Sequence, residues 1–121
     1  MSDVEYLDLE DLIGLVRRLG VGPVRDVGLL DAAVARPRSS AFGTDAYATL
    51  ELKAAALLHS LVRHHPLVDG NKRLGWLATV VFLDLNGRPV TLDDEKAFAL
   101  VVEVAEGRRA VDDIADRLAS G

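Results

Sequence analysis

The fold is decided by the stretch from His65 to Gly87, which reads HPLVDGNKRLGWLATVVFLDLNG. A short segment rich in polar residues precedes a long apolar one, whose hydrophobic residues recur with the three- and four-residue spacing of an α-helix. Gly70 or Asn71 is a suitable start for this helix, and Asn86-Gly87 is a suitable end. Its wide apolar stripe predicts a central, largely buried helix.

The segments on both sides have the same helical periodicity. Asp8 and Asp11 form a capping-box pattern at the start of the first helix, and Asp26 can cap the second. We expect further helices at residues 9–19, 27–36, 49–64, 93–106 and 111–118. Residues 1–121 are therefore predicted to form a single all-α domain, a compact bundle of about six helices around a central helix.

Three details of this prediction concern segments outside the central helix. Residues 37–48 are rich in Ser, Gly, Thr and Pro, so they are expected to form an irregular loop that is functional or mobile. Only residues 88–91 have any strand character. In the fifth helix, the periodicity predicts that Phe98, Val101 and Val102 point inward.

The composition narrows the class of protein. The formal net charge is -5, and no tail rich in lysine or arginine is present, so direct nucleic-acid binding is not expected. The chain has no cysteine, which excludes disulfides and thiol catalysis and suits a reducing compartment. It shows no signal peptide and no apolar run long enough to cross a bilayer. We expect a cytoplasmic protein without membrane contact.

The polar segment before the central helix has the parts of an anion-binding site. A helix start presents unpaired N–H groups and a partial positive charge, and Gly70 lets the backbone approach a ligand closely. Asn71 can contact a phosphate oxygen or orient the loop, and Lys72 and Arg73 add two full positive charges. Asp69 would repel an anion unless a cation lies between them, and Mg²⁺ fits that position.

His65 lies just before this segment and supplies the remaining chemical group. Its ordinary pKa near 6.5 suits a general base that deprotonates a hydroxyl beside the bound phosphate. Each residue alone has a simpler explanation, such as helix capping by Asp69 or solvation of Lys72 and Arg73. Their combination at one helix start favours a site. A zinc site from His59, His64 and Asp69 is a weaker alternative, because its spacing is not that of known helical zinc motifs.

The segment from His65 to Arg73 resembles the motif H-x-F-x-[DN]-[AG]-N-K-R of the Doc (death-on-curing) toxin branch of the Fic/Doc superfamily. Leu67 stands where phenylalanine is usual, so the loop is expected to sit slightly differently. The resemblance extends over nearly the whole chain, including residues 6–11, 25–30, 35–37, 53–58 and 85–87.

The resemblance implies a reaction. Fic adenylyltransferases carry H-P-F-x-[DE]-G-N-G-R-x-x-R, whereas here Lys72 replaces the second glycine and Trp76 the last arginine. In the Doc branch this difference implies transfer of a phosphoryl group from ATP rather than AMP transfer. His65 would be the catalytic base, Asp69 would hold Mg²⁺, and Gly70 with Asn71, Lys72 and Arg73 would bind the phosphates.

The resemblance also implies partners. The acceptor would be a Ser or Thr hydroxyl, with translation elongation factor Tu as the expected substrate, so that translation stops. A cognate antitoxin with a disordered segment would fold onto the bundle and block activity. Two alternatives remain open: a Fic-type protein adenylyltransferase, and a non-catalytic module that binds a nucleotide or a partner.

Overall fold

The computed structural model describes residues 3–120, and nearly all of its regular structure is helical. The α-helices are α1 (Leu9–Leu19), α2 (Val27–Ala35), α3 (Leu50–His64), α4 (Asn71–Leu85), α5 (Asp94–Ala105) and α6 (Val111–Ser120). A 3₁₀ turn, η1 (Arg36–Arg38), follows α2, and strands β1 (Ser40–Ala41) and β2 (Thr44–Asp45) pair as an antiparallel hairpin. The predicted all-α class is confirmed.

Helices α1, α2, α3 and α5 begin where the sequence predicts, and the start of each has a capping side chain. The Asp11 N–H donates to Asp8 Oδ1 at 2.8 Å and the Asp8 N–H to Asp11 Oδ2 at 2.9 Å, so the predicted capping box exists. Asp26, Thr49 and Asp93 accept a backbone N–H in the same way at the starts of α2, α3 and α5. These caps satisfy donors that a helix start leaves unpaired.

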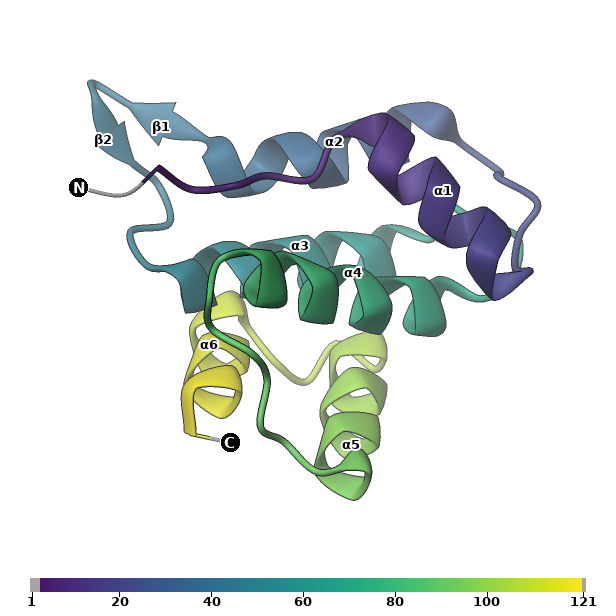
Figure 1. Ribbon diagram of the computed structural model, residues 1–121. Coiled ribbons are helices and arrows are strands. Elements are labelled where there is room, and N and C mark those ends of the chain that lie inside the picture. Colours follow the sequence, from purple (N-terminus) through teal and green to yellow (C-terminus); the bar gives the residue numbers. More distant parts are fainter. Residues whose placement is uncertain (1–2, 121) are drawn as a thin grey trace.

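Helices α3 and α4 together form the central layer of the molecule, so the helix predicted to be central at residues 71–85 shares that place with α3, which has more neighbours. Figure 1 shows α3 and α4 side by side, with α1 and α2 on one side and α5 and α6 on the other. Helix α3 packs against α2, η1, α4, α5 and α6, whereas α4 packs mainly against α1, α3 and α5. The outer side of α4 therefore remains accessible, and its Leu85 side chain is 54% exposed.

Gly75 sets the distance between α3 and α4. A Cβ atom at this position would lie 2.7 Å from Val62 Cγ2 and 3.2 Å from Leu58 Cδ1, both on α3. The absence of a side chain thus allows the two helices to approach closely. Since the connection between them carries the predicted site, this contact also fixes the separation of the two ends of that connection.

Two predictions about non-helical segments were wrong. Residues 88–91 form no strand; Pro89 has no N–H to donate, and this connection lies beside no strand in the part of the chain that is described. The hairpin formed by β1 and β2 lies instead inside the segment expected to be irregular. Its tip carries Phe42 and Gly43, both with positive φ.

The prediction that Phe98 points inward was also wrong. Its side chain is 72% exposed, and the buried face of α5 is formed by Ala97, Leu100, Val101 and Val104. None of the helices within residues 3–120 has the length and apolar composition that a membrane crossing requires.

Candidate active site between helices α3 and α4

The predicted site lies in the six-residue connection from His65 to Gly70, at the end of the bundle away from the hairpin (Figure 1). His65 ends α3 with φ 52° and ψ 61°, a left-handed conformation that is uncommon for a residue other than glycine. Gly70 begins α4 with φ 95°. The chain therefore turns sharply at both ends of the connection, which we call the motif loop.

The motif loop is held by residues 22–26, which run antiparallel to it between α1 and α2. The Val68 N–H donates to Pro23 O at 2.9 Å, and the Gly22 N–H donates to Asp69 O at 3.0 Å. Val24 and Leu67 form an isolated antiparallel bridge, which lies between the Val68–Pro23 bond and the bond from the Arg25 N–H to Pro66 O. Backbone pairing along its length makes the loop a fixed platform rather than a mobile connection.

Leu67 anchors the loop in the core although it is smaller than the phenylalanine usual at this position. Its side chain is 1% exposed, and it belongs to the main hydrophobic cluster. Full burial of a leucine stabilises a fold by about 1.5–3 kcal/mol. The anchoring role is therefore preserved by the shorter side chain.

The Asn71 side chain is used inside the loop. Its Oδ1 accepts the Leu67 N–H at 2.9 Å, and its Nδ2 donates to Leu67 O at 3.0 Å. Asn71 is only 8% exposed, so these bonds are shielded from water. Of the two roles predicted for this side chain, the geometry corresponds to orienting the loop. Its backbone N–H, in the first turn of α4, is the group that points toward an anion at the helix start.

Asn71 also contacts the predicted base. Its Nδ2 lies 3.4 Å from His65 Nδ1. The two bonds to Leu67 fix the amide orientation, so Nδ2 is a donor, and a neutral His65 that accepts it carries its proton on Nε2. A ring that carries its proton on Nε2 cannot accept another proton at that atom. To act as a base through Nε2, His65 must carry its proton on Nδ1 instead, and Nδ1 can then no longer accept the hydrogen bond from Asn71. The exposed position of the ring leaves room for it to move away from Asn71.

The start of α4 has the features of an anion site. No side chain caps Gly70, so the first N–H groups of α4 are available to a ligand. Lys72 and Arg73 are exposed in the first turn. Together these groups provide a partial positive charge and two full ones at one end of the loop.

Asp69 is exposed beside this anion site, and its carboxylate makes no hydrogen bond or ion pair with any residue in the range 3–120. It therefore does not cap α4. No group of three His, Cys, Asp or Glu side chains that could hold a metal exists within these residues, which excludes the zinc alternative there. A single free carboxylate beside an anion site fits Mg²⁺, which takes the rest of its ligands from phosphate oxygens and water.

Replacing Gly70 with alanine is expected to lower the free energy of unfolding by about 2 kcal/mol, because a Cβ there would collide with Val21 in addition to straining a positive φ. The control is Gly87→Ala, since Gly87 has φ 74° but open space around it. That variant should lose about 1 kcal/mol, from backbone strain alone. Chemical denaturation measures both values, and equal losses would show that Val21 does not constrain the loop.

A second polar cluster lies along α3, between the hairpin and the motif loop. Arg36 donates to the Tyr47 hydroxyl at 2.7 Å through Nε, and its Nη1 lies 3.0 Å from both His59 Nδ1 and Ser60 Oγ. The His64 ring lies edge-on to the His59 ring, with 6.4 Å between centroids. Burial, followed by the charges of Arg36, His64 and Arg63, holds the pKa of His59 below its usual value.

The lowered pKa of His59 predicts a pH-dependent stability. The unfolded state binds a proton on His59 more readily than the folded state does. The contribution of neutral His59 to the free energy of unfolding is therefore complete above the ordinary pKa of 6.5, and it is lost as the pH falls through the lower pKa of the folded state. The melting temperature should therefore decrease less steeply between pH 7 and pH 5, about the range of histidine titration, in His59→Asn than in the wild type. The control His64→Asn should keep most of the wild-type slope, because it removes only one of the smaller causes and leaves the burial of His59 and the Arg36 charge in place. A His59→Asn slope equal to the wild type would contradict the assignment.

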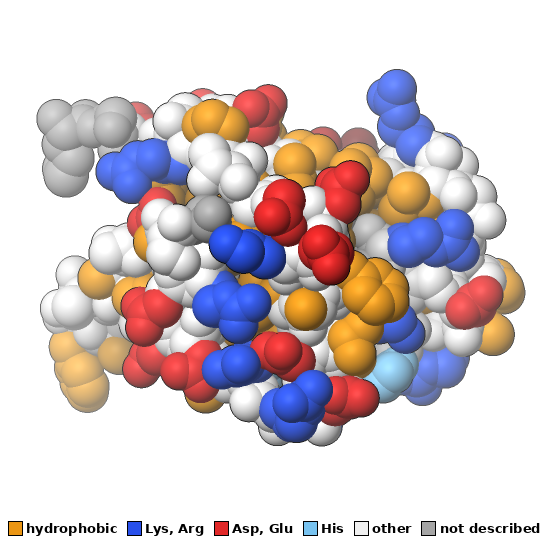
Figure 2. Space-filling view, turned by 90° about the horizontal axis from the view of Figure 1, so that it is seen from below, with side chains coloured by type: hydrophobic (Ala, Val, Ile, Leu, Met, Phe, Trp, Pro, Cys, Tyr) orange, Lys and Arg blue, Asp and Glu red, His pale blue; other side chains and the backbone are white. Residues whose placement is uncertain are grey.

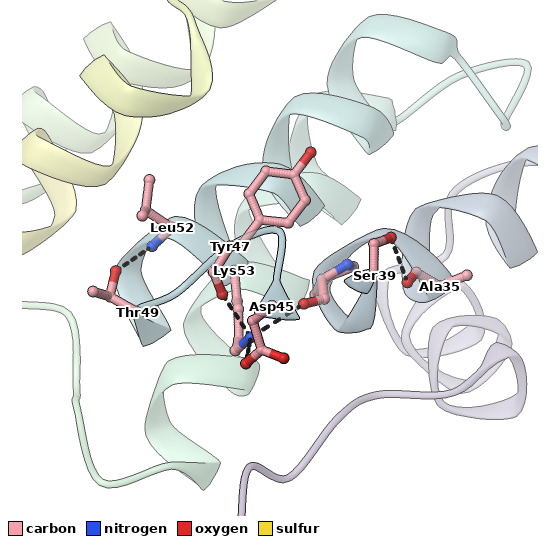
Figure 3. A network of polar contacts seen from close by, with 8 residues as sticks. Ala35, Ser39, Asp45, Tyr47, Thr49, Leu52 and Lys53 are labelled. Carbon is pink, nitrogen blue, oxygen red and sulfur yellow. Dashed lines mark hydrogen bonds and ion pairs between the residues drawn. The ribbon is translucent and has the colours of Figure 1, made fainter. Parts of the chain in front are cut away.

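The hairpin is attached to α3 by Lys53, as Figure 3 shows. Lys53 is 2% exposed, and its Nζ donates to Tyr47 O at 2.6 Å and to Asp45 Oδ2 at 3.1 Å. The Ser39 hydroxyl faces Ala35 O at 3.5 Å, so it is occupied locally. The hairpin is thus held at the end of α3 away from His65 and does not lie beside the motif loop (Figure 1).

An apolar groove of about 530 Å³ begins at the predicted anion site. Lys72, Arg73 and Trp76 from α4 line it on one side, and the buried Val101 and the exposed Phe98 from α5 line it on the other. The end of α1 contributes as well. Sequence reasoning missed this groove because Phe98 has the spacing of a core residue, and its exposure depends on how α5 lies against α4.

The face of the molecule formed by α5 and α6 has mixed charge. Figure 2 shows Lys and Arg side chains alternating there with Asp and Glu. On this face Glu103 accepts a hydrogen bond from Arg109 Nε at 2.7 Å, and this bond holds the pKa of the Glu103 carboxyl below its usual value. The intermixed charges form no basic stripe of the kind that attracts nucleic acid on this face.

Comparison with known proteins agrees with this geometry. A model of the Fic/DOC family matches residues 6–83, which include α1 to most of α4 and the whole motif loop. The chain is 50% identical over 119 residues to the protein named Toxin Doc from Mycolicibacterium smegmatis, an alignment that covers 95% of this chain and 92% of that protein. The chain therefore belongs to the Fic/DOC family.

Proposed function

We propose that this protein is the toxin of a type II toxin–antitoxin pair and acts as a kinase that phosphorylates a Ser or Thr hydroxyl of a protein, with ATP and Mg²⁺ as cofactors. The observation that carries the proposal is the motif loop, which holds an exposed histidine and an unpaired carboxylate rigidly beside an uncapped helix start. The 50% identity to a protein named Toxin Doc supports the toxin role.

Each residue of the site has a defined part in this reaction. The helix start of α4, Lys72 and Arg73 hold the phosphates, and Asp69 holds Mg²⁺ against them. His65 accepts the proton of the acceptor hydroxyl. Phosphoryl transfer depends mainly on positioning and electrostatic stabilisation, so a small rigid domain with these groups is sufficient. The magnesium ion, when bound, neutralises charge that develops on the transferred group.

Lys72 and Trp76 favour phosphoryl transfer over AMP transfer. Both lie at the positions that carry a glycine and an arginine in the adenylyltransferase motif, and Lys72 adds a charge close to the helix start. The proposed substrate is translation elongation factor Tu in the cytoplasm. Intact-mass spectrometry of that factor, incubated with this protein, ATP and Mg²⁺, tests the reaction.

A gain of one phosphate group, about 80 Da, on elongation factor Tu is the expected result. A gain equal to AMP would mean that the protein is an adenylyltransferase. No gain, together with growth arrest on expression, would mean a different acceptor protein. No gain and no growth arrest would contradict the toxin proposal.

We also propose that the antitoxin segment, disordered when free, folds as an amphipathic helix in the groove between α1, α4 and α5. The groove is apolar and has Lys72 and Arg73 at one end. An acidic residue at one end of the bound helix would pair with these cations and occupy the phosphate site. This arrangement explains inhibition by simple competition.

Phe98→Ala is expected to weaken antitoxin binding at least tenfold, because large aromatic side chains in the middle of a groove carry much of the binding energy. The side chain is 72% exposed, so its loss should not affect folding. Phe42→Ala is the control, since Phe42 is also an exposed phenylalanine but lies on the hairpin. Calorimetric titration with a synthetic antitoxin segment measures both, and equal affinities would place the antitoxin elsewhere.

A further inference from the structure

We propose that Arg25 is a positioning residue for the base His65, and that it holds the left-handed backbone conformation from which the imidazole faces the start of α4. Arg25 lies outside the motif loop, in the segment that joins α1 to α2. The inference rests on the proposed function for the kinetic part of its test.

Arg25 binds three successive carbonyl groups around the base. Its Nε donates to His65 O at 2.8 Å, and its Nη2 donates to His64 O at 3.1 Å. Its backbone N–H donates to Pro66 O at 2.8 Å. Within the described residues, all the hydrogen bonds that Arg25 donates therefore go to the backbone carbonyls of residues 64–66.

These bonds meet a specific need of the backbone. The last carbonyls of a helix have no partner within it, and α3 ends at His64. His65 then adopts φ 52°, a conformation that a residue with a Cβ keeps only where its surroundings enforce it. A guanidinium group satisfies two adjacent carbonyls with one planar fork, and its positive charge is favourable at a helix C-terminus.

The role of Arg25 is not that of an ion-pair partner. None of the ion pairs found within residues 3–120 includes it. It is an exposed residue, so it does not fill the core either. The role that the structure supports for Arg25 is to bind the backbone carbonyls of residues 64–66.

Arg25 and Asn71 hold His65 from two directions. Arg25 fixes the backbone on either side of the residue, and Asn71 contacts the ring at Nδ1. A rotation of the His65 backbone toward ordinary helical angles would point the ring away from the start of α4. Loss of Arg25 should therefore misplace the base while leaving the phosphate site intact.

The test compares Arg25→Gln and Arg25→Lys with the control Arg63→Gln. Arg63 also caps a helix, since its Nη1 donates to Ala105 O at the end of α5, but it does not touch the motif loop. We expect Arg25→Gln to lower kcat for phosphoryl transfer by about 10- to 100-fold with an unchanged KM for ATP. Arg25→Lys, which cannot form the fork, should fall between this variant and the wild type, and Arg63→Gln should lower only the melting temperature.

A second measurement does not depend on the reaction. The NMR chemical shifts and backbone coupling of His65 report its positive φ, and they should change in Arg25→Gln but not in Arg63→Gln. An inactive wild type would refute the proposed function. The NMR measurement would then still decide whether Arg25 holds His65. Unchanged His65 signals in Arg25→Gln would overturn the inference, and so would an unchanged kcat in an active protein.

Discussion

Replacing His65 with alanine is expected to lower the rate of phosphoryl transfer by roughly 10²- to 10⁴-fold, the usual contribution of a general base. The affinity for Mg²⁺ and ATP should be unchanged, because the proposed phosphate and metal groups belong to residues 69–73. The His65 ring is exposed, and its one described hydrogen-bond contact is the long one to Asn71 at 3.4 Å. Folding should therefore be little affected. Single-turnover transfer to elongation factor Tu and calorimetric titration with ATP measure the two properties.

His64→Ala provides the matched control for this prediction. His64 is the preceding residue and is also exposed, but its ring lies edge-on to the His59 ring and makes no contact of the kind that His65 makes with Asn71. This variant should transfer phosphate at close to the wild-type rate. If both variants lost the rate equally, or if His65→Ala kept it, then His65 would not be the base.

The helices could be predicted from the sequence because their signals are local. Asp8, Asp26 and Thr49 cap helices at the positions expected, each through a bond to the residue three positions later. Such bonds depend only on the chain within one turn. The positions of the helix starts follow directly from the sequence for this reason.

The arrangement of the helices could not be predicted in the same way. Periodicity gives the apolar side of a helix, but it does not say how many neighbours cover that side. Helix α3 is more enclosed than α4 because η1, α2 and α6 all pack on it. Lys53 shows that burial cannot be predicted from the residue type alone. A lysine is expected at the surface, yet Lys53 is buried because residues 37, 45 and 47 supply oxygen atoms around its Nζ.

The residues of the candidate site could be predicted from the sequence, but the way in which the fold holds them could not. The motif contains a histidine, a carboxylate and two cations, which the structure places at one end of α4. The pairing of residues 22–26 with the motif loop joins segments about forty residues apart, so it cannot be predicted from the local sequence of either segment. The use of the Asn71 amide within the loop is likewise a result of tertiary geometry.

Asn71→Asp is expected to produce the largest loss of stability among the substitutions considered, about 3 kcal/mol. The new side chain has the same shape and can still accept the Leu67 N–H, but it cannot donate to Leu67 O and places a buried negative charge against that carbonyl. The charge also lies in the first turn of α4, where it would repel phosphate. Transfer activity should become undetectable, and the stability deficit should shrink at acidic pH, because a protonated carboxyl again donates to Leu67 O.

Asn86→Asp separates the effect of the motif loop from that of the amide itself. Asn86 forms the same pair of bonds to one residue, accepting the Glu5 N–H at 2.8 Å and donating to Glu5 O at 2.9 Å. It lies at the other end of α4 and is partly open to solvent, so its loss should lower the free energy of unfolding by only about 1 kcal/mol. Transfer activity should be unaffected in this variant. If the two variants were equally stable and equally active, the Asn71 amide would not hold the loop, and His65 would have to be positioned by the backbone contacts of residues 22–26 alone.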